Sequence, residues 1–308
     1  MLNVIQAELF RSKKSKLFWL ILTAIFINGG VYGMAVATSE VFDDIFVMPL
    51  FILLAAYFSL MIGREYADGT MRNKIIAGKT KATIYFAQIT LSLMTSMIFI
   101  GAFFIPFIVI ASTTMAANIP LAVILSSSAG FVMSIFVWSI LFTVVSILIS
   151  SREIAAIINF ILFFAIMISA YQINHSLGQQ EYIGTYNTET PVQMSPEEVK
   201  LAVEGMFEGS HYSEHNDEGV ITYFKIVESD EEVLNPRYID EPFSTILQTI
   251  EYLLPYGQLN TYVSTLTGYM YADSEEDVPF HLFPLYSLCM LALLIVIGFF
   301  AFRKKDLT

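Results

Sequence analysis

Long uninterrupted runs of apolar residues dominate the chain, and six of them have the length of a membrane span. From Ala82 to Ser151 there are 70 consecutive residues without Asp, Glu, Lys or Arg. A bilayer span needs roughly 20 apolar residues, so this stretch alone fits two spans joined by a short turn. The pattern predicts six transmembrane helices, over Leu17–Ala37, Ile45–Gly63, Thr83–Ala111, Leu121–Ile149, Ile154–Tyr171 and Leu282–Phe302.

Residues 1–16 combine an apolar side with a basic end. An apolar helical face would carry Leu2, Ile5, Leu9 and Phe10, with four basic residues in the second half of the segment. One interpretation is an amphipathic helix on the cytoplasmic membrane surface, where anionic lipids attract cations. The other is a basic flank of the first span. We predict the amphipathic helix for residues 1–16.

The basic residues predict the orientation of the spans. Thirteen of the 16 Lys and Arg residues fall in residues 1–16, 64–81, 150–153 and the tail after the sixth run. Basic loops stay on the cytoplasmic side. The sequence therefore predicts a multi-pass protein of a bacterial cell membrane, with both termini cytoplasmic.

The segment 172–280 differs from the rest in charge. It holds 20 of the 28 acidic residues and only three basic ones, a formal charge of −17. Ser195 to Glu198 has the form of a helix start, Val220–Val227 has the composition of a strand, and Phe243–Leu254 has a helical pattern. Glu208–Gly219 is interpreted as a loop. We expect a folded, extracytoplasmic insertion.

The predicted fold is an all-α membrane protein with an N-terminal amphipathic helix and a mixed α+β extracytoplasmic insertion between spans five and six. The domain division has four parts. They are the surface helix 1–16, spans one to five in 17–171, the acidic outer domain 172–280, and span six with a basic cytoplasmic tail in 281–308.

The low charge content fits a membrane protein, since only 14% of residues are charged, against about 25% in soluble domains. The motifs argue against an enzyme. The sequence has no His-Glu-x-x-His and no Gly-x-Ser-x-Gly pattern. His211 and His215 could share a face with nearby acids, but a solvated loop is favoured there. We predict no catalytic residues, no metal site and no nucleic-acid partner.

The chain also shows no internal energy source. The six runs contain no Asp, Glu, Lys or Arg, whereas ion-coupled transporters carry such residues within their spans. Gly78-Lys79-Thr80 ends like a phosphate loop, but the glycine that the motif needs five residues earlier is Asn73. ATP binding by this chain is therefore not expected.

The loop 64–81 between spans two and three is short and polar, yet its pattern predicts a helix over Thr70–Ala77. Thr70 or Asp68 could cap the helix and Gly78 could end it. A short capped helix suits docking in the groove of a partner. The alternative is a solvated basic loop that only sets the topology.

Three short patterns in this loop resemble the coupling-helix region of ABC-2 type transporter permeases. They are Gly63-Arg64-Glu65, Asp68-Gly69-Thr70 and Arg72-Asn73-Lys74. The six-span plan, the N-terminal amphipathic helix and the stretch Leu253 to Leu259 before the last span are also similar to that family. The likeness covers most of the chain except the acidic region near 175–240.

The resemblance implies the permease subunit of an ABC exporter. Such a subunit needs no cofactor of its own, because a separate ATP-binding subunit holds ATP and magnesium. A second permease copy or a homologous permease would complete the dimer. The residues expected to face the ATPase are Arg64, Glu65, Asp68, Gly69, Thr70, Arg72, Asn73 and Lys74.

Similar permeases export antimicrobial peptides, lantibiotics, lipids, polysaccharides or drugs, and some give resistance to antimicrobial peptides. The expected cargo is thus a peptide, a lipid-like or a drug-like molecule. One other function stays open, a non-transporting sensor or immunity protein that binds a ligand through its acidic outer domain. A membrane enzyme, such as a lipid-modifying transferase, would need a clustered acid/base or metal site near a membrane face, and the sequence shows none.

Overall fold

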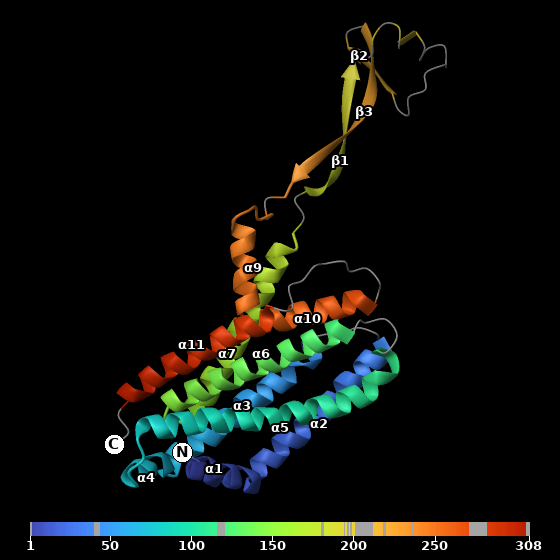
Figure 1. The fold of residues 1–308 in the computed structure, drawn as a ribbon. Coiled ribbons are helices and arrows are strands. Elements are labelled where there is room, and N and C mark those ends of the chain that lie inside the picture. Colours follow the sequence, from blue (N-terminus) through green and yellow to red (C-terminus); the bar gives the residue numbers. More distant parts are fainter. Residues whose placement is uncertain are drawn as a thin grey trace. The chain divides into compact units, whose positions relative to one another are not determined.

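The computed structural model describes residues 2–39, 44–115, 121–179, 182–193, 195, 197, 199–200, 212–217, 220–235, 237–270 and 282–305. Helices predominate (Figure 1). Their bounds are α1 Leu2–Lys14, α2 Lys16–Ser39, α3 Met48–Ala67, α4 Thr70–Ile76, α5 Lys81–Met115, α6 Leu121–Leu148, α7 Arg152–Leu177, α9 Phe243–Leu253, α10 Pro255–Met270 and α11 Phe283–Lys304. Strands β1 Tyr182–Gln193, β2 Tyr212–Asp217 and β3 Val220–Leu234 lie between α7 and α9 in sequence.

Six helices of the described chain are long and apolar enough to cross a membrane. They are α2, α3, α5, α6, α7 and α11, and they coincide with the six apolar runs. The prediction of six apolar helices in a multi-pass arrangement is confirmed at this level. The third helix is longer than expected, because α5 continues to Met115.

Aromatic rings and small polar residues pack the interior of the helix bundle. The Trp138 ring centroid lies 5.7 Å from that of Phe51 and 5.3 Å from that of Phe163, which joins α3, α6 and α7. The Ser96 hydroxyl donates to Ser139 Oγ at 2.7 Å between α5 and α6. In an apolar surrounding, such hydroxyl pairs and close ring contacts hold helices that the hydrophobic effect alone does not drive together.

Helices α2 and α5 approach closely at Gly29. A Cβ atom on Gly29 would lie 2.1 Å from the carbonyl oxygen of Phe103. Small residues permit this backbone contact between membrane helices. The aromatic side chains on the facing turns of α5 then reach Tyr32, whose ring stacks on Phe107 at 5.0 Å.

The buried side of the first helix carries Ile5, from the expected apolar face, together with polar residues. Ile5, Glu8 and Ser12 are each 8% exposed, whereas Phe10 is 62% exposed. The Ser12 and Tyr57 hydroxyls are 2.6 Å apart, which joins α1 to α3. Phe10, on the expected apolar face, is exposed, and polar partners on α3 contribute to the rotation of α1.

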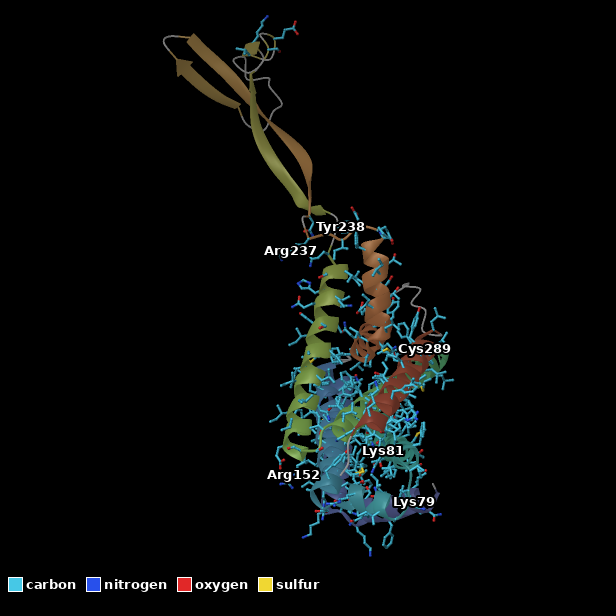
Figure 2. The ribbon with its side chains drawn as sticks, turned by 90° about the vertical axis from the view of Figure 1, so that its left-hand side faces the viewer. Lys79, Lys81, Arg152, Arg237, Tyr238 and Cys289 are labelled. Atoms are coloured by element: carbon cyan, nitrogen blue, oxygen red, sulfur yellow. The ribbon has the colours of Figure 1, made fainter. Side chains whose placement is uncertain are left out.

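Helix α1 and the end of α11 lie beside α4 at one end of the bundle. Arg11 of α1 pairs with Glu65 at the end of α3, and Lys81 donates to the Arg303 carbonyl oxygen near the end of α11. Figure 2 shows Lys79 and Arg152 toward this same end. The four basic segments of the sequence therefore share one end of the bundle.

Helices α9 and α10 follow the acidic segment, but most of their length belongs with the spans. The chain divides into one unit of residues 1–174 and 245–308 and a second unit of residues 175–244. Tyr256 and Leu259 on α10 are 2% and 1% exposed because they pack in the span core. The acidic outer domain was expected over 172–280, whereas the second unit of the structure ends at Ser244.

The second unit contains a three-stranded antiparallel sheet in the order β1-β3-β2. The strand predicted over Val220–Val227 lies within β3. The loop predicted over Glu208–Gly219 is wrong in its centre, where β2 pairs with β3 in a register that sets His215 opposite Thr222. Of the helix predicted to start at Ser195, residues 196, 198 and those beyond 200 lie outside the described residues.

Candidate functional site: the α4 loop and its ionic cluster

Two glycines bracket α4. Gly69 precedes the helix with φ +67°, and its carbonyl oxygen accepts the first helical bond from Asn73 N at 2.9 Å. Gly78 follows the helix with φ +78°, and its N–H donates to the Ile75 carbonyl oxygen. Left-handed backbone at both ends favours glycine. The predicted end at Gly78 is confirmed.

The predicted side-chain cap of α4 is not present. Asp68 Oδ2 instead lies 3.3 Å from Arg64 Nε on the surface. The Thr70 hydroxyl donates backward to the Glu65 carbonyl oxygen at 2.9 Å. Thr70 therefore ties the first turn of α4 to the last turn of α3, and Gly69 provides the reversal between them.

A fully buried carboxylate lies under α4. Glu65 has 0% exposure, although it occurs in the polar part of the sequence. Its Oε1 lies 2.7 Å from Arg11 Nη2, and its Oε2 lies 2.6 Å from Lys74 Nζ. The Gln88 amide also donates to Oε2 at 2.7 Å. Each oxygen of this carboxylate thus has a charged partner.

A second carboxylate completes the arrangement. Glu8 Oε1 lies 2.9 Å from Lys74 Nζ, and Glu8 Oε2 lies 2.7 Å from Arg11 Nη2. Two acids and two bases alternate, so the formal charge of the group is zero. We call Glu8, Arg11, Glu65 and Lys74 the ionic cluster. It joins α1, α3 and α4, and Gln88 adds α5.

Burial makes the ionic cluster sensitive to loss of Glu8, Glu65 or Lys74, whereas Arg11 is 43% exposed. Removing a partner of a buried ion pair leaves an uncompensated charge, which costs about 3–5 kcal/mol. Removing an exposed pair costs about 0–1 kcal/mol. α4 is thus held in place by charge pairing rather than by apolar area alone, although Met71 on its inner side is 2% exposed.

The chain tail forms a second anchor beside the loop. Lys305 Nζ donates to the Ile147 carbonyl oxygen at 2.9 Å and to the Tyr66 hydroxyl at 3.0 Å. It also lies 4.2 Å from the Tyr66 ring centroid. Burial lowers the pKa of Lys305 to about 8. The ends of α3, α6 and α11 therefore meet next to α4.

The side of α4 that points away from the ionic cluster is exposed. Arg72 and Asn73 are exposed, and Ile76 is 73% exposed. We call Arg72, Asn73 and Ile76 the α4 outer face. An apolar side chain between polar ones, on a short helix with fixed ends, is a surface that a partner groove can bind.

The eight residues predicted to face a partner divide into two groups. Arg64, Asp68, Arg72 and Asn73 are exposed, and Gly69 and Thr70 are partly exposed. Glu65 and Lys74 lie in the ionic cluster, with side-chain exposures of 0% and 14%. Glu65 therefore cannot touch a partner, and its contacts give it a positioning role instead.

Sequence reasoning did not identify Glu8, Gln88 or Lys305 as part of this site. The sequence offered one sign that Glu8 belongs to the site, because Glu8 is an acidic residue in an otherwise basic amphipathic segment. Within the described residues, no group of three His, Cys, Asp or Glu side chains could hold a metal ion. His215 lies in β2, and His211 lies outside the described residues.

Comparison with known proteins gave no match among protein-family models, curated proteins or solved structures.

Proposed function

We propose that this chain is the permease subunit of an ABC exporter, and that a separate ATP-binding subunit docks on the α4 outer face. The observation that carries the proposal is the buried ionic cluster, which fixes α4 to α1 and α3. A loop that served only to set topology would need basic residues but no such anchoring. The sequence likeness of the loop to coupling helices supports the same function.

In the proposed mechanism, one set of residues contacts the ATP-binding subunit and another transmits its movement to the spans. Ile76 and Arg72 would contact the partner, because they are exposed. Glu65 and Lys74 would transmit movement, because their ion pair connects α4 to α3 and to α1. A displacement of α4 on ATP binding would then tilt these helices together rather than bend the loop.

The finer placement belongs to the same proposal. The α4 end of the bundle would face the cytoplasm, with both termini, and the segment between α7 and α10 would form a mixed α+β insertion outside. The lipid bilayer of a bacterial cell membrane would surround the six spans. A second permease, identical or homologous, would pair with this one. The cargo class is a peptide, a lipid-like or a drug-like molecule, and ATP and magnesium would bind the partner.

The test is copurification from the native membrane. The tagged chain is purified in mild detergent, and an ATP-binding subunit is identified by mass spectrometry and by ATPase activity. We expect Ile76→Asp and Arg72→Glu to lose this subunit. Arg303→Glu is the matched control, because it reverses an exposed charge at the same end of the bundle but off α4.

Crosslinking gives the contact directly. In a Cys289→Ser background, Asn73→Cys carries a photoreactive label on the α4 outer face, and Lys13→Cys carries it on exposed α1. The proposal expects crosslinks to the ATP-binding subunit to be strongest from position 73. A chain that brings no ATP-binding subunit, or whose partner tolerates both α4 variants, would instead support the ligand-binding sensor.

A further inference from the structure

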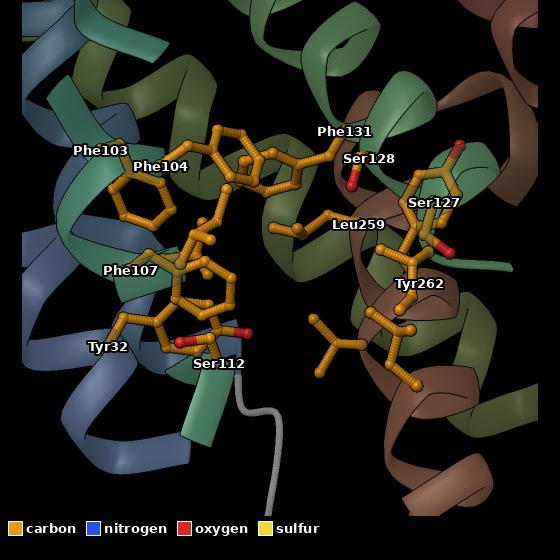
Figure 3. Close-up of a pocket in the computed structure, with 15 residues that line it drawn as sticks. Tyr32, Phe103, Phe104, Phe107, Ser112, Ser127, Ser128, Phe131, Leu259 and Tyr262 are labelled. Atoms are coloured by element: carbon orange, nitrogen blue, oxygen red, sulfur yellow. The ribbon is translucent and has the colours of Figure 1, made fainter. Parts of the chain in front are cut away.

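A cavity of about 330 Å³ lies among α2, α5, α6 and α10, at the end of the bundle away from α4 (Figure 3). Its volume is near the low end of the range for small-molecule sites, about 300–1,000 Å³. α5 begins beside α4 at Lys81, and the cavity is lined by its far half, from Phe103 to Ser112. The cavity and the ionic cluster are therefore separate sites.

Aromatic and aliphatic side chains form the two walls. On one side, the ring of Phe107 stacks against Tyr32, and the ring of Phe103 lies 6.3 Å from that of Phe107. Leu259 lies on the other side in Figure 3, and the Phe131 ring, 5.4 Å from that of Phe104, connects the two walls at one end. The described lining includes no Asp, Glu, Lys, Arg or His. The buried part of any occupant must be uncharged, because no partner would compensate a charge.

A buried hydroxyl on the α6 wall supplies a second, independent indication of a ligand. Ser127 is 4% exposed, and its Oγ has no hydrogen-bond partner among the described residues. A buried hydroxyl left unpaired is costly. A neutral acceptor, such as an ester carbonyl oxygen, would accept the Ser127 hydrogen. The neighbouring Ser128 is also part of the lining.

The lining of the cavity reaches the outer surface of α5, where we place its mouth. Ile108 lines the cavity and is 55% exposed, and Ser112 beside it is exposed as well. An exposed apolar residue on a membrane helix faces lipid tails, because those tails are its most favourable surroundings. Entry from the bilayer therefore fits this mouth better than entry of a polar molecule from water.

We propose that this cavity binds one acyl chain of an ester-linked lipid from the surrounding bilayer. The chain lies between the aromatic walls, and the ester carbonyl oxygen accepts a hydrogen bond from Ser127. The small volume favours a single chain rather than a bulky ring system. This binding needs no ATP-binding subunit, so it stands independently of the proposed exporter function.

The test uses the purified full chain in phosphatidylcholine nanodiscs without any partner. The probe is lysophosphatidylcholine with a diazirine in its tail. We expect photolabelling to concentrate on residues 103–112 and 124–131. Ser128→Trp fills the cavity and should abolish this labelling. Ser169→Trp, which adds the same bulk to an exposed site on α7, should leave it unchanged.

A second arm tests the hydrogen bond with a variant that removes only one oxygen atom. Ser127→Ala should lower the affinity for the ester-linked probe by about 2- to 10-fold, which corresponds to the loss of one hydrogen bond. It should not affect an ether-linked probe of the same length. Because Ser127→Ala adds no bulk, a folded variant is expected, and its elution profile checks this.

Three results would overturn the inference. Labelling spread evenly over all lipid-facing helices and insensitive to Ser128→Trp would show ordinary bilayer contact only. An equal effect of Ser127→Ala on ester and ether probes would remove the carbonyl contact. A rigid aromatic compound that displaces the probe more strongly than unlabelled lysolipid would replace the acyl chain as the occupant.

Discussion

Lys74 Nζ and Glu65 Oε2 are 2.6 Å apart, and this contact closes the α4 loop onto the end of α3. Nine positions separate the two residues in the chain, and the turn at Gly69 brings them together. The exposed side of α4 is therefore attached to a charge pair beneath it. A force applied to α4 is carried into α3 without first unfolding the loop.

Lys74→Met tests the energetic weight of this contact. The change leaves the buried Glu65 carboxylate with one cation fewer, and we expect a loss of about 3–5 kcal/mol in the free energy of unfolding. Thermal unfolding in detergent, followed by elution profile, measures it. Arg64→Ala removes the exposed pair with Asp68 and should cost about 0–1 kcal/mol.

A double variant distinguishes charge from packing. Glu65→Gln with Lys74→Met leaves Glu8 and Arg11 as a balanced pair. We expect the double variant to be less destabilised than the sum of the two single variants. The reason is that the double variant leaves no buried charge without a partner of opposite sign. Simple additivity would show that the two side chains act through packing, and the role of the ion pair in holding α4 would then be wrong.

The sequence predicted the helices of the bundle well and the ionic cluster poorly, for a physical reason. Six apolar runs are local patterns, and bilayer thickness fixes their length. The cluster depends on Arg11 and Gln88, which lie 54 and 23 positions from Glu65 and meet it only after the helices pack. Glu65 was recognised as part of the loop, but its burial follows from that packing alone.

Helix α10 shows a similar limit. Tyr256 and Leu259 follow an acidic segment and precede the last span, so the sequence placed them in the outer domain 172–280. Their burial in the span core is decided by partners on other helices, such as Phe163, whose ring centroid lies 6.4 Å from that of Tyr256. Turn residues were more informative, since Gly78 does end α4.

Gly63 and Gly69 should respond differently to alanine. A Cβ on Gly63 would lie 2.4 Å from the Cα of Arg152, so α3 and α7 would have to separate. A Cβ on Gly69 meets nothing within 4 Å, and only the left-handed backbone resists it, at about 1–2 kcal/mol. We expect Gly63→Ala to lower the unfolding temperature more than Gly69→Ala does. The reverse order would contradict the close contact between α3 and α7.

Lys305 should make stability depend on pH in a specific window. Burial lowers the pKa of Lys305 from 10.5 to about 8. Between these values the unfolded chain binds the proton more strongly than the folded chain, so this contribution to stability rises as pH increases from 8 to 10.5. The difference between wild type and Lys305→Met, measured by thermal unfolding across this range, should shift in favour of wild type with rising pH. A flat difference would mean that the ammonium is not desolvated.

Glu251 should give the opposite dependence on pH. Its side chain is buried, its Oε1 accepts a hydrogen bond from Asn174 Nδ2 at 2.9 Å, and burial raises its pKa above the ordinary value of 4.5. The folded chain therefore binds this proton more strongly, and the contribution to stability is lost as pH rises from 4.5 through the raised pKa. In Glu251→Gln an amide oxygen can accept the same bond without a charge. We expect this variant to match wild type in acid and to be more stable at neutral pH, by thermal unfolding. Asp68→Asn, which changes an exposed carboxylate, should follow the wild-type profile, and a destabilised Glu251→Gln at neutral pH would show that the charged form is the one the fold requires.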